Sequence, residues 1–138
     1  MEPREHKAVL MADDDAEDCM LATEAFAKSG SNAAFACVVD GVELMDYLAE
    51  RSRSGTSALP NLILLDLNMP RKDGRKALVE IQSEPALQHI PIVILTTSKE
   101  EKDVALTMKA GAKSFITKPE TFDEWVEMMK SLAESWLS

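Results

Sequence analysis

The run Leu62-Ile63-Leu64-Leu65, ended at once by Asp66, limits the possible folds of this chain more than any other segment. Four consecutive apolar residues predict a strand buried on both faces, which is typical of a parallel sheet covered by helices on both sides. Asp66 then places a carboxylate at the carboxyl end of a buried strand. Open α/β sheets bind their ligands at this edge. We therefore predict that Asp66 belongs to the functional site.

Short apolar strands alternate with amphipathic helices along the whole chain. The predicted strands are 7–12, 33–39, 61–66, 91–96 and 114–117. The predicted helices are 16–28, one that follows Asp40-Gly41, one that ends at Ser83 before Pro85, one that ends at Ala110-Gly111, and a last one after Thr121. Because right-handed crossovers lay each helix against the sheet, these units predict an α/β fold with a parallel sheet and helices on both faces.

Two predicted helices begin with the spacing of a capping box. Ser98 is followed three residues later by Glu101, and Thr121 is followed by Glu124. At this spacing each side chain can bond to the backbone N–H of the other residue. We predict that both pairs cap helices, and that the second helix frays into the polar stretch 51–59, where variation in length is best tolerated.

Composition excludes several classes of protein. A net charge of −9 at pH 7 leaves nothing to neutralise a row of phosphates, so neither nucleic acid nor an anionic membrane surface is an expected partner. No apolar stretch approaches membrane-spanning length, and the N-terminus lacks the apolar core of a signal peptide, so we expect a cytoplasmic protein. Cys19 and Cys37 are expected to be buried free thiols rather than a disulfide or a metal site.

Residues that could make Asp66 reactive follow the other predicted strands. Asp13 and Asp14 come after the first strand, Thr96 ends the fourth, and Lys118 follows the fifth. Three carboxylates at one edge of a sheet repel by roughly 4 kcal/mol per close pair at an effective dielectric of 20. Such a cluster needs a bound cation or a proton. Oxygen ligands alone favour a hard cation, and Mg²⁺ fits best because it bridges carboxylates to phosphate.

Each of these residues taken alone has a simpler explanation. An acidic run such as Asp13 to Asp15 often caps a helix. A threonine at a strand end, such as Thr96, is usually packing or capping, and a lysine before proline is commonly a solvated turn. Their joint occurrence at successive strand ends favours the functional interpretation of the set.

This set of residues resembles the receiver domain of two-component response regulators. The resemblance rests on Asp13-Asp14, Asp66, Thr96 and Lys118-Pro119, and it covers nearly the whole chain. It implies a CheY-like, flavodoxin-like (βα)5 three-layer sandwich whose five-stranded parallel sheet has the order 2-1-3-4-5. Residues 1–138, with a core of about 7–137, would then form a single receiver domain with no output domain.

A longer string narrows the resemblance. The residues from Leu64 to Pro70, followed by Asp73-Gly74, are similar to those of the stand-alone regulators paired with bacterial phytochrome-type histidine kinases. A sensor histidine kinase of this type is therefore the implied phosphoryl donor.

The resemblance also implies a role for each site residue. Asp66 would accept a phosphoryl group from the kinase in a Mg²⁺-dependent reaction and become an aspartyl phosphate. Asp14 and Asp66 would ligate the metal directly, Asn68 would contribute its backbone carbonyl, and Asp13 would act through water. Lys118 and Mg²⁺ would offset charge on the transferring oxygens. The protein would be a phosphoacceptor that dephosphorylates itself slowly, rather than an enzyme acting on an outside substrate.

The output would depend on Thr96 and on Phe115, the matching position for the switch aromatic of the family. The Thr96 hydroxyl would bond to the phosphoryl group, and Phe115 would turn inward. This would reshape the surface formed by the fourth helix, fifth strand and fifth helix, which would bind a downstream protein target or a second copy of the chain. Trp136-Leu137 at the end of the last helix could belong to that interface or to the core.

Two alternatives remain open from the sequence. A pseudo-receiver would bind its partners independently of phosphorylation. A Mg²⁺-dependent phosphatase that works through an aspartyl phosphate usually needs a second acid two positions after the nucleophile, where this chain has Asn68.

Overall fold

A computed structural model describes residues 7–55 and 58–137, in which strands and helices alternate as predicted. The strands are β1 (Ala8–Ala12), β2 (Ala34–Val38), β3 (Leu62–Leu65), β4 (Ile92–Thr96) and β5 (Ser114–Thr117). The helices are α1 (Ala16–Lys28), α2 (Gly41–Arg53), α3 (Gly74–Ser83), α4 (Glu101–Lys109) and α5 (Phe122–Trp136). All strand pairs are parallel and follow the order β2-β1-β3-β4-β5, which confirms the predicted fold class.

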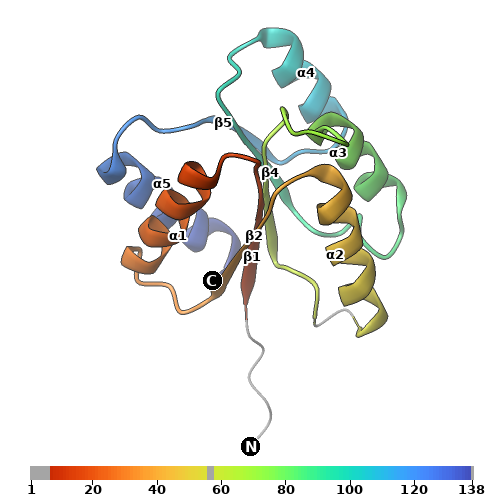
Figure 1. Cartoon of the computed structure of the whole chain (residues 1–138), viewed down its shortest axis with the longest axis horizontal. Helices are drawn as coiled ribbons and strands as arrows, with labels where there is room; N and C mark the ends of the chain where they lie inside the picture. The colour runs from red at the N-terminus through yellow and green to blue at the C-terminus, as the bar shows by residue number, and fades with distance from the viewer. Residues whose placement is uncertain (1–6, 56–57, 138) are drawn as a thin grey trace, which may run out of the picture.

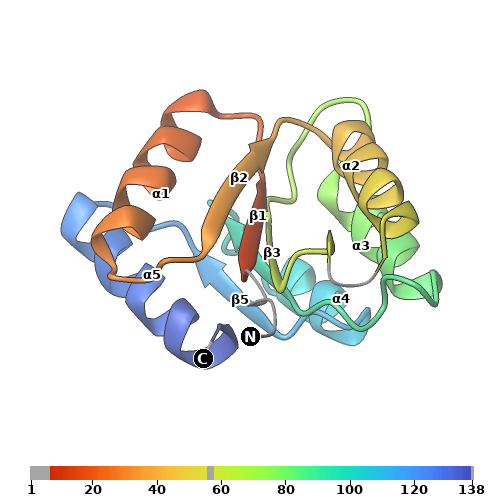
Figure 2. The same cartoon turned by 90° about the horizontal axis from the view of Figure 1, so that it is seen from below.

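Helices cover both faces of this sheet. In Figures 1 and 2, α1 and α5 lie on one side, and α2, α3 and α4 lie on the other. Successive strand residues face opposite sides, so Leu10 and Ile63 pack under α2 and α3, whereas Val9 and Leu62 pack with α1 and α5. Because both faces are buried, the central strands are apolar throughout rather than alternating.

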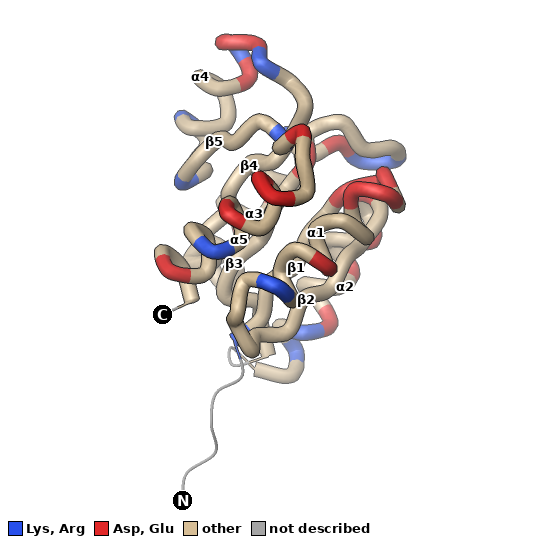
Figure 3. The backbone as a smooth tube through the Cα atoms, turned by 90° about the vertical axis from the view of Figure 1, so that its left-hand side faces the viewer, with Lys and Arg blue, Asp and Glu red and all other residues tan. Residues whose placement is uncertain are grey.

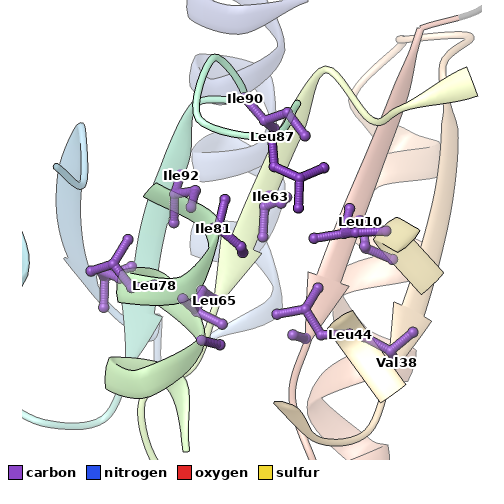
Figure 4. Close-up of a cluster of buried hydrophobic side chains, with 14 of the residues drawn as sticks. Leu10, Val38, Leu44, Ile63, Leu65, Leu78, Ile81, Leu87, Ile90 and Ile92 are labelled. Atoms are coloured by element: carbon purple, nitrogen blue, oxygen red, sulfur yellow. The ribbon is translucent and has the colours of Figure 1, made fainter. Parts of the chain in front are cut away.

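The centre of the core under α2 and α3 consists of fully buried apolar side chains. Figure 4 shows Leu44 of α2 and Leu78 and Ile81 of α3 beside the strand residues Leu10 and Ile63, and all five are buried. Each such side chain contributes about 1.5–3 kcal/mol when removed from water. This core packs α2 and α3 against the sheet and so supports the loops at the ends of the strands.

The end of α5 packs inward on the opposite face. Trp125 and Met129 are buried beside Phe26 of α1. Trp136 and Leu137, which the sequence alone left between packing and an interface, are half-buried against the same cluster. They therefore contribute to the core of this chain.

Only one of the two predicted capping boxes forms. The Thr121 hydroxyl accepts a hydrogen bond from Glu124 N at 3.2 Å, and the Glu124 carboxylate accepts one from Thr121 N at 3.2 Å. The prediction for Ser98 is wrong, because α4 begins at Glu101 with no side-chain cap. The Ser98 hydroxyl lies before this helix: it accepts a hydrogen bond from Glu100 N at 3.3 Å and donates one to the buried Asp103 carboxylate at 2.7 Å, where the charged acceptor makes the stronger bond.

Helix α2 is longer than predicted. Residues 51–53, expected to fray into a loop, form its last turn. The Arg51 guanidinium lies 4.8 Å from the centre of the Tyr47 ring one turn earlier, a cation–π contact that stabilises this end of the helix. Of the remaining predicted loop, residues 56–57 lie outside the described residues, and Leu59 is buried in the core.

Charged residues lie mainly on the helices and on the loops at the strand ends. In Figure 3 many acidic segments lie at the end of the molecule opposite the N-terminus. Strand β1 runs from the N-terminus toward this end, which is therefore the carboxyl edge of the sheet (Figure 1). No helix within the described ranges is long and apolar enough to cross a membrane.

The start of α3 is pressed against the residues that follow β3. A Cβ atom on Gly74 would lie 2.1 Å from Asp66 O and 2.8 Å from Leu67 Cα. Gly74 N also donates a hydrogen bond to Leu67 O at 2.9 Å. Only glycine fits here, so Gly74 fixes the distance between α3 and the backbone of Asp66.

We expect Gly74→Ala to lower the free energy of unfolding by about 1–3 kcal/mol, because the added methyl group overlaps backbone atoms that cannot move aside. This loss exceeds the gain of about 1 kcal/mol that alanine brings to a helix. Urea denaturation measures the change. Glu101→Ala, at the exposed first residue of α4, is the matched control and should change stability little. A Gly74→Ala protein as stable as the wild type would contradict the close approach.

Candidate functional site

Backbone hydrogen bonds past the ends of the strands bring the predicted site residues to one edge. Asp66 N donates to Ala12 O at 3.0 Å, which places Asp66 beside Asp13. Lys118 N donates to Thr96 O at 2.9 Å, so the ladder between β4 and β5 also continues by one residue. The parallel sheet thus positions residues from four strand ends around one point.

Three carboxylates converge there. One oxygen from each of Asp13, Asp14 and Asp66 lies within 4.8 Å of the others. Asp13 is 1% exposed and Asp66 is 6% exposed, whereas Asp14 is open to solvent. The cluster is therefore buried on the side of Asp13 and Asp66 and accessible to solvent on the side of Asp14.

Helix capping accounts for only one acid of the run that follows β1. The Asp15 carboxylate accepts hydrogen bonds from Glu17 N at 2.9 Å and from Asp18 N at 3.2 Å, and so caps α1. Asp13 uses one oxygen to accept a hydrogen bond from Asp15 N at 2.9 Å. Its other oxygen and the Asp14 carboxylate are left to face the cluster.

The Lys118 ammonium lies among carboxylates. Its Nζ is 2.7 Å from an oxygen of Asp13, 2.7 Å from an oxygen of Asp18 and 3.6 Å from Asp66 Oδ2. The contact with Asp18 is a directed hydrogen bond. The contact with Asp13 is an ion pair with poor hydrogen-bond direction, which leaves the buried Asp13 Oδ2 without a hydrogen-bond donor among the described residues. Lys118 supplies the positive charge closest to Asp66 Oδ2.

Sequence reasoning missed Asp18. It lies in the first turn of α1, directly after the acidic run that follows β1, and this position near the same strand end was the signal that the sequence offered. Its partner Lys118 is 100 residues away in the chain, so the ion pair itself had no local signature.

Burial and charge shift two pKa values at the site in the same direction. Burial raises the pKa of Asp13 to about 6, and this outweighs the lowering by Lys118. Burial alone lowers the pKa of Lys118, but its contacts with Asp13 and Asp18 raise it more, so the net shift is upward. Lys118 therefore remains cationic at neutral pH, while charge on Asp13 is costly unless something offsets it.

The residues at the cluster fit a hard divalent cation. Every donor in it is a carboxylate oxygen. The buried Asp13 Oδ2 is ion-paired with Lys118 at 2.7 Å but accepts no well-directed hydrogen bond within the described part of the chain, so a water molecule bound to the cation could donate one to it. Asn68 lies exposed two residues after Asp66, and the metal role of its backbone carbonyl stays a prediction.

A polar network extends outward from Thr96. Thr96 is fully buried, and its hydroxyl accepts a hydrogen bond from Ser98 N at 3.3 Å. Ser98 bonds in turn to Asp103, which Arg75 holds through two hydrogen bonds of 3.0 and 2.9 Å. The hydrogen bond from Ser98, followed by the one from Arg75, holds the pKa of Asp103 below its usual value. Sequence reasoning missed the Arg75–Asp103 pair, because no pattern links residues 28 apart on two helices.

The loop after β3 is tied down by a second ion pair. Arg71 has a φ of 66°, a left-handed conformation that costs a non-glycine residue about 1–2 kcal/mol. Its Nε donates to the buried Asp40 carboxylate at 2.8 Å, and this hydrogen bond lowers the pKa of Asp40. Gly41 N donates to Lys72 O at 3.0 Å. The β3–α3 loop, which carries Asn68, is thus fastened to the start of α2.

Phe115 and the two cysteines do not belong to the group of three acids that converge at the site. Phe115 is on β5, half-buried against the core beneath α2 and α3. Cys19 and Cys37 are free, as predicted, but half-buried rather than fully buried. The Cys19 thiol donates weakly to Asp13 O, with an S···O distance of 3.8 Å.

Comparisons with known proteins agree with this arrangement. The family model described as the response regulator receiver domain matches residues 9–130. Response regulator Rcp1 from Synechocystis sp. (strain ATCC 27184 / PCC 6803 / Kazusa) is 35% identical over 131 residues, which are 95% of this chain and 89% of Rcp1.

Two solved structures extend the comparison to the fold. The crystal structure of the phosphorylated cyanobacterial phytochrome response regulator RcpA has a TM-score of 0.86 and 38% identity, and covers 96% of this chain and 95% of RcpA. The Mn(2+)-bound form of Rcp1 has a TM-score of 0.83 and 35% identity, with 96% and 95% covered. The flavodoxin-like topology of the chain is that of these proteins.

We expect Mg²⁺ to stabilise the fold through Asp14. Saturation at 100 times the dissociation constant adds about 2.7 kcal/mol to the free energy of unfolding. Asp14→Asn should remove most of this gain because it removes an exposed ligand, and should change metal-free stability by less than about 1 kcal/mol. Denaturation with and without Mg²⁺ measures both quantities. Asp46→Asn, exposed on α2, is the control and should keep the whole gain; an equal gain in Asp14→Asn would exclude Asp14 as a ligand.

The raised pKa of Asp13 predicts a pH dependence in the presence of a chelator. Because the folded protein binds the proton more tightly than the unfolded chain, stability from this group is present below pH 3.8 and is lost as the pH rises through about 6. The loss is on the order of 3 kcal/mol at 1.36 kcal/mol per pKa unit. Asp13→Asn should therefore be more stable than the wild type at pH 7 and not at pH 4. Denaturation midpoints at both pH values test this, and a difference that does not change with pH would contradict it.

Proposed function

The chain belongs to the response regulator receiver domain family, and on that premise we propose that it is a signalling protein phosphorylated on Asp66 by a histidine kinase. The environment of the Asp66 carboxylate carries the proposal. Asp13 and Asp14 converge on it, and the Lys118 ammonium is 3.6 Å from its Oδ2. A carboxylate nucleophile, oxygen ligands for a cation and a fixed positive charge are what phosphoryl transfer to an aspartate requires.

In the proposed reaction, an Asp66 oxygen attacks phosphorus in line. The new O–P bond forms as the bond between phosphorus and the kinase histidine nitrogen breaks. The Lys118 ammonium stabilises the charge that develops on the phosphoryl oxygens. Asp66, Asp14, the backbone carbonyl of Asn68 and, through water, Asp13 would hold Mg²⁺, which when bound neutralises carboxylate and phosphoryl charge. The Mn(2+)-bound form of Rcp1 supports a divalent ion at such a site, and the phosphorylated form of RcpA supports the modification.

The proposed switch begins at the buried Thr96 hydroxyl. In the present structure this hydroxyl accepts from Ser98 N at 3.3 Å. The hydroxyl can donate to a phosphoryl oxygen on Asp66 while it still accepts from Ser98 N. Movement of Thr96 toward the phosphoryl group would therefore draw the β4–α4 loop with it and let Phe115 turn further into the space left. If the resting and switched conformations are populated 99:1 before phosphorylation, reversing that ratio needs about 5.5 kcal/mol in favour of the switched conformation. Several charge-assisted hydrogen bonds to the phosphoryl group can approach this value.

The proposed partners are a kinase and a reader of the changed surface. RcpA is named a phytochrome response regulator, which supports a phytochrome-type histidine kinase as the donor. The reader would be a downstream protein or a second copy of the chain bound at the α4–β5–α5 face. Met108 of α4 has an exposed apolar side chain, whereas Leu106 lines the hollow between α3 and α4 and Trp136 packs inward. A location in the cytoplasm is also part of the proposal.

Asp66→Asn should abolish phosphorylation, because the amide lacks the nucleophilic oxygen. Intact mass spectrometry after incubation with Mg²⁺ and acetyl phosphate, or with a phosphorylated histidine kinase, should find one added phosphoryl group on the wild type and none on the variant. Asp46→Asn, an exposed acid of α2, should be modified like the wild type.

The other possible outcomes separate the alternatives. A wild-type protein that gains no phosphoryl group from either donor would be a pseudo-receiver. Rapid hydrolysis of assorted phosphate esters would indicate a phosphatase. An adduct that persists in Asp66→Asn would place the acceptor elsewhere.

A further inference from the structure

Asp18 contacts the site but is not one of the three acids that converge as possible metal ligands. Those acids are Asp13, Asp14 and Asp66. The Asp18 carboxylate instead accepts a directed hydrogen bond from Lys118 Nζ at 2.7 Å, and its side chain is 21% exposed. Its role is therefore tied to the ammonium rather than to the cation.

A lysine ammonium needs anchoring if it is to point at one atom. It is a compact charge on a flexible four-carbon stem with three donor hydrogens. In this structure Asp13 and Asp18 each lie 2.7 Å from Nζ, while Asp66 Oδ2 lies at 3.6 Å. Two anchors thus hold the ammonium beside Asp66 without a close contact to it.

These two anchors would differ once the proposed reaction begins. Asp13 Oδ2, which is ion-paired with Lys118 in this structure, would also accept from the hydration shell of Mg²⁺, and Asp66 would carry the phosphoryl group. Asp18 lies outside the converging cluster, so its contact with Lys118 survives both events. Its position is also secured, because its backbone N donates to Asp15 within the capped first turn of α1.

We propose that Asp18 is a positioning residue that holds the Lys118 ammonium against the phosphoryl group during transfer to Asp66. This inference rests on the proposed function of Asp66. In the metal-free protein Asp18 shares the ammonium with Asp13, and in the loaded protein it becomes the anchor that remains.

The test compares two ways of removing one negative charge from the first turn of α1. Asp18→Asn is nearly isosteric and loses the ion pair with Lys118. Glu17→Gln removes an exposed charge from the neighbouring residue, which makes no contact with Lys118 among the described residues, and is the matched control. Asp18→Glu keeps the charge on a longer arm and tests rescue.

Two measurements are made on each variant. The rate of Asp66 phosphorylation by acetyl phosphate is followed by mass spectrometry at saturating Mg²⁺. Separately, the ¹H–¹⁵N signal of the Lys118 ammonium reports in the unphosphorylated protein whether the side chain is anchored, since exchange with water broadens the signal of a free ammonium.

We expect Asp18→Asn to slow phosphorylation about tenfold and to broaden the Lys118 signal, as loss of a charge-assisted hydrogen bond predicts. Glu17→Gln should stay within about twofold of the wild-type rate, and Asp18→Glu should recover most of the rate and of the signal. Equal slowing in Asp18→Asn and Glu17→Gln would mean that only net charge matters and would overturn the inference.

A wild-type rate in Asp18→Asn would also overturn it, whatever the Lys118 signal shows. Should Asp18→Asn not fold, the rate and signal of Asp18→Glu decide, and a protein that is fully folded and anchored yet about tenfold slow would contradict positioning. Failure of the wild type to be phosphorylated would reject the function proposed for Asp66, and the ammonium signal alone would then show whether Asp18 anchors Lys118.

Discussion

The ion pairing of the Lys118 ammonium with surrounding carboxylates is the interaction on which the rest of the site depends. Two of these carboxylates, Asp13 and Asp66, are almost completely buried, and like charges this close repel by several kcal/mol without a cation between them. Lys118 reaches them because β5 pairs with β4 and carries it one residue past the sheet. The acidic cluster is therefore stabilised only when β5 pairs with β4 and brings the Lys118 charge to the carboxylates.

The loops around this cluster are held by contacts that leave little freedom. Gly74 lets α3 begin directly against the backbone of Asp66. The ion pair between Arg71 and Asp40 offsets the cost of the left-handed backbone conformation of Arg71. On the other side, Thr96 is joined through Ser98 to the Arg75–Asp103 pair between α3 and α4. The Asp66 backbone is thus fixed by its neighbours, while the buried Thr96 hydroxyl at the end of β4 is joined to groups that lead to the molecular surface. Under the proposed function, this combination suits a protein in which phosphorylation changes the surface.

Much of the fold could be predicted because its signals are local. Strands buried on both faces are apolar runs, and their observed ends differ from the predicted ones by no more than one residue. Helix α1 has the predicted bounds, and Thr121 with Glu124 forms the predicted capping box. The prediction for Ser98 failed because α4 begins two residues later than expected, with Glu100 as its N-cap, while the Ser98 hydroxyl donates to Asp103, which Arg75 holds from another helix. A local pattern cannot reveal a competitor supplied by tertiary packing.

The sequence by itself determined which chemical groups lie at the strand ends, and hence that Asp66, Thr96 and Lys118 meet at one edge, because parallel strands of a covered sheet all end on the same side. Only the tertiary structure decided how the acids share their tasks. It assigned helix capping to Asp15, paired the buried Asp13 Oδ2 with the Lys118 ammonium, and paired Asp18 with the same lysine, 100 residues away. The physical reason is that periodicity and capping are properties of neighbouring residues, whereas an ion pair depends on which helix the packed core places beside which strand end.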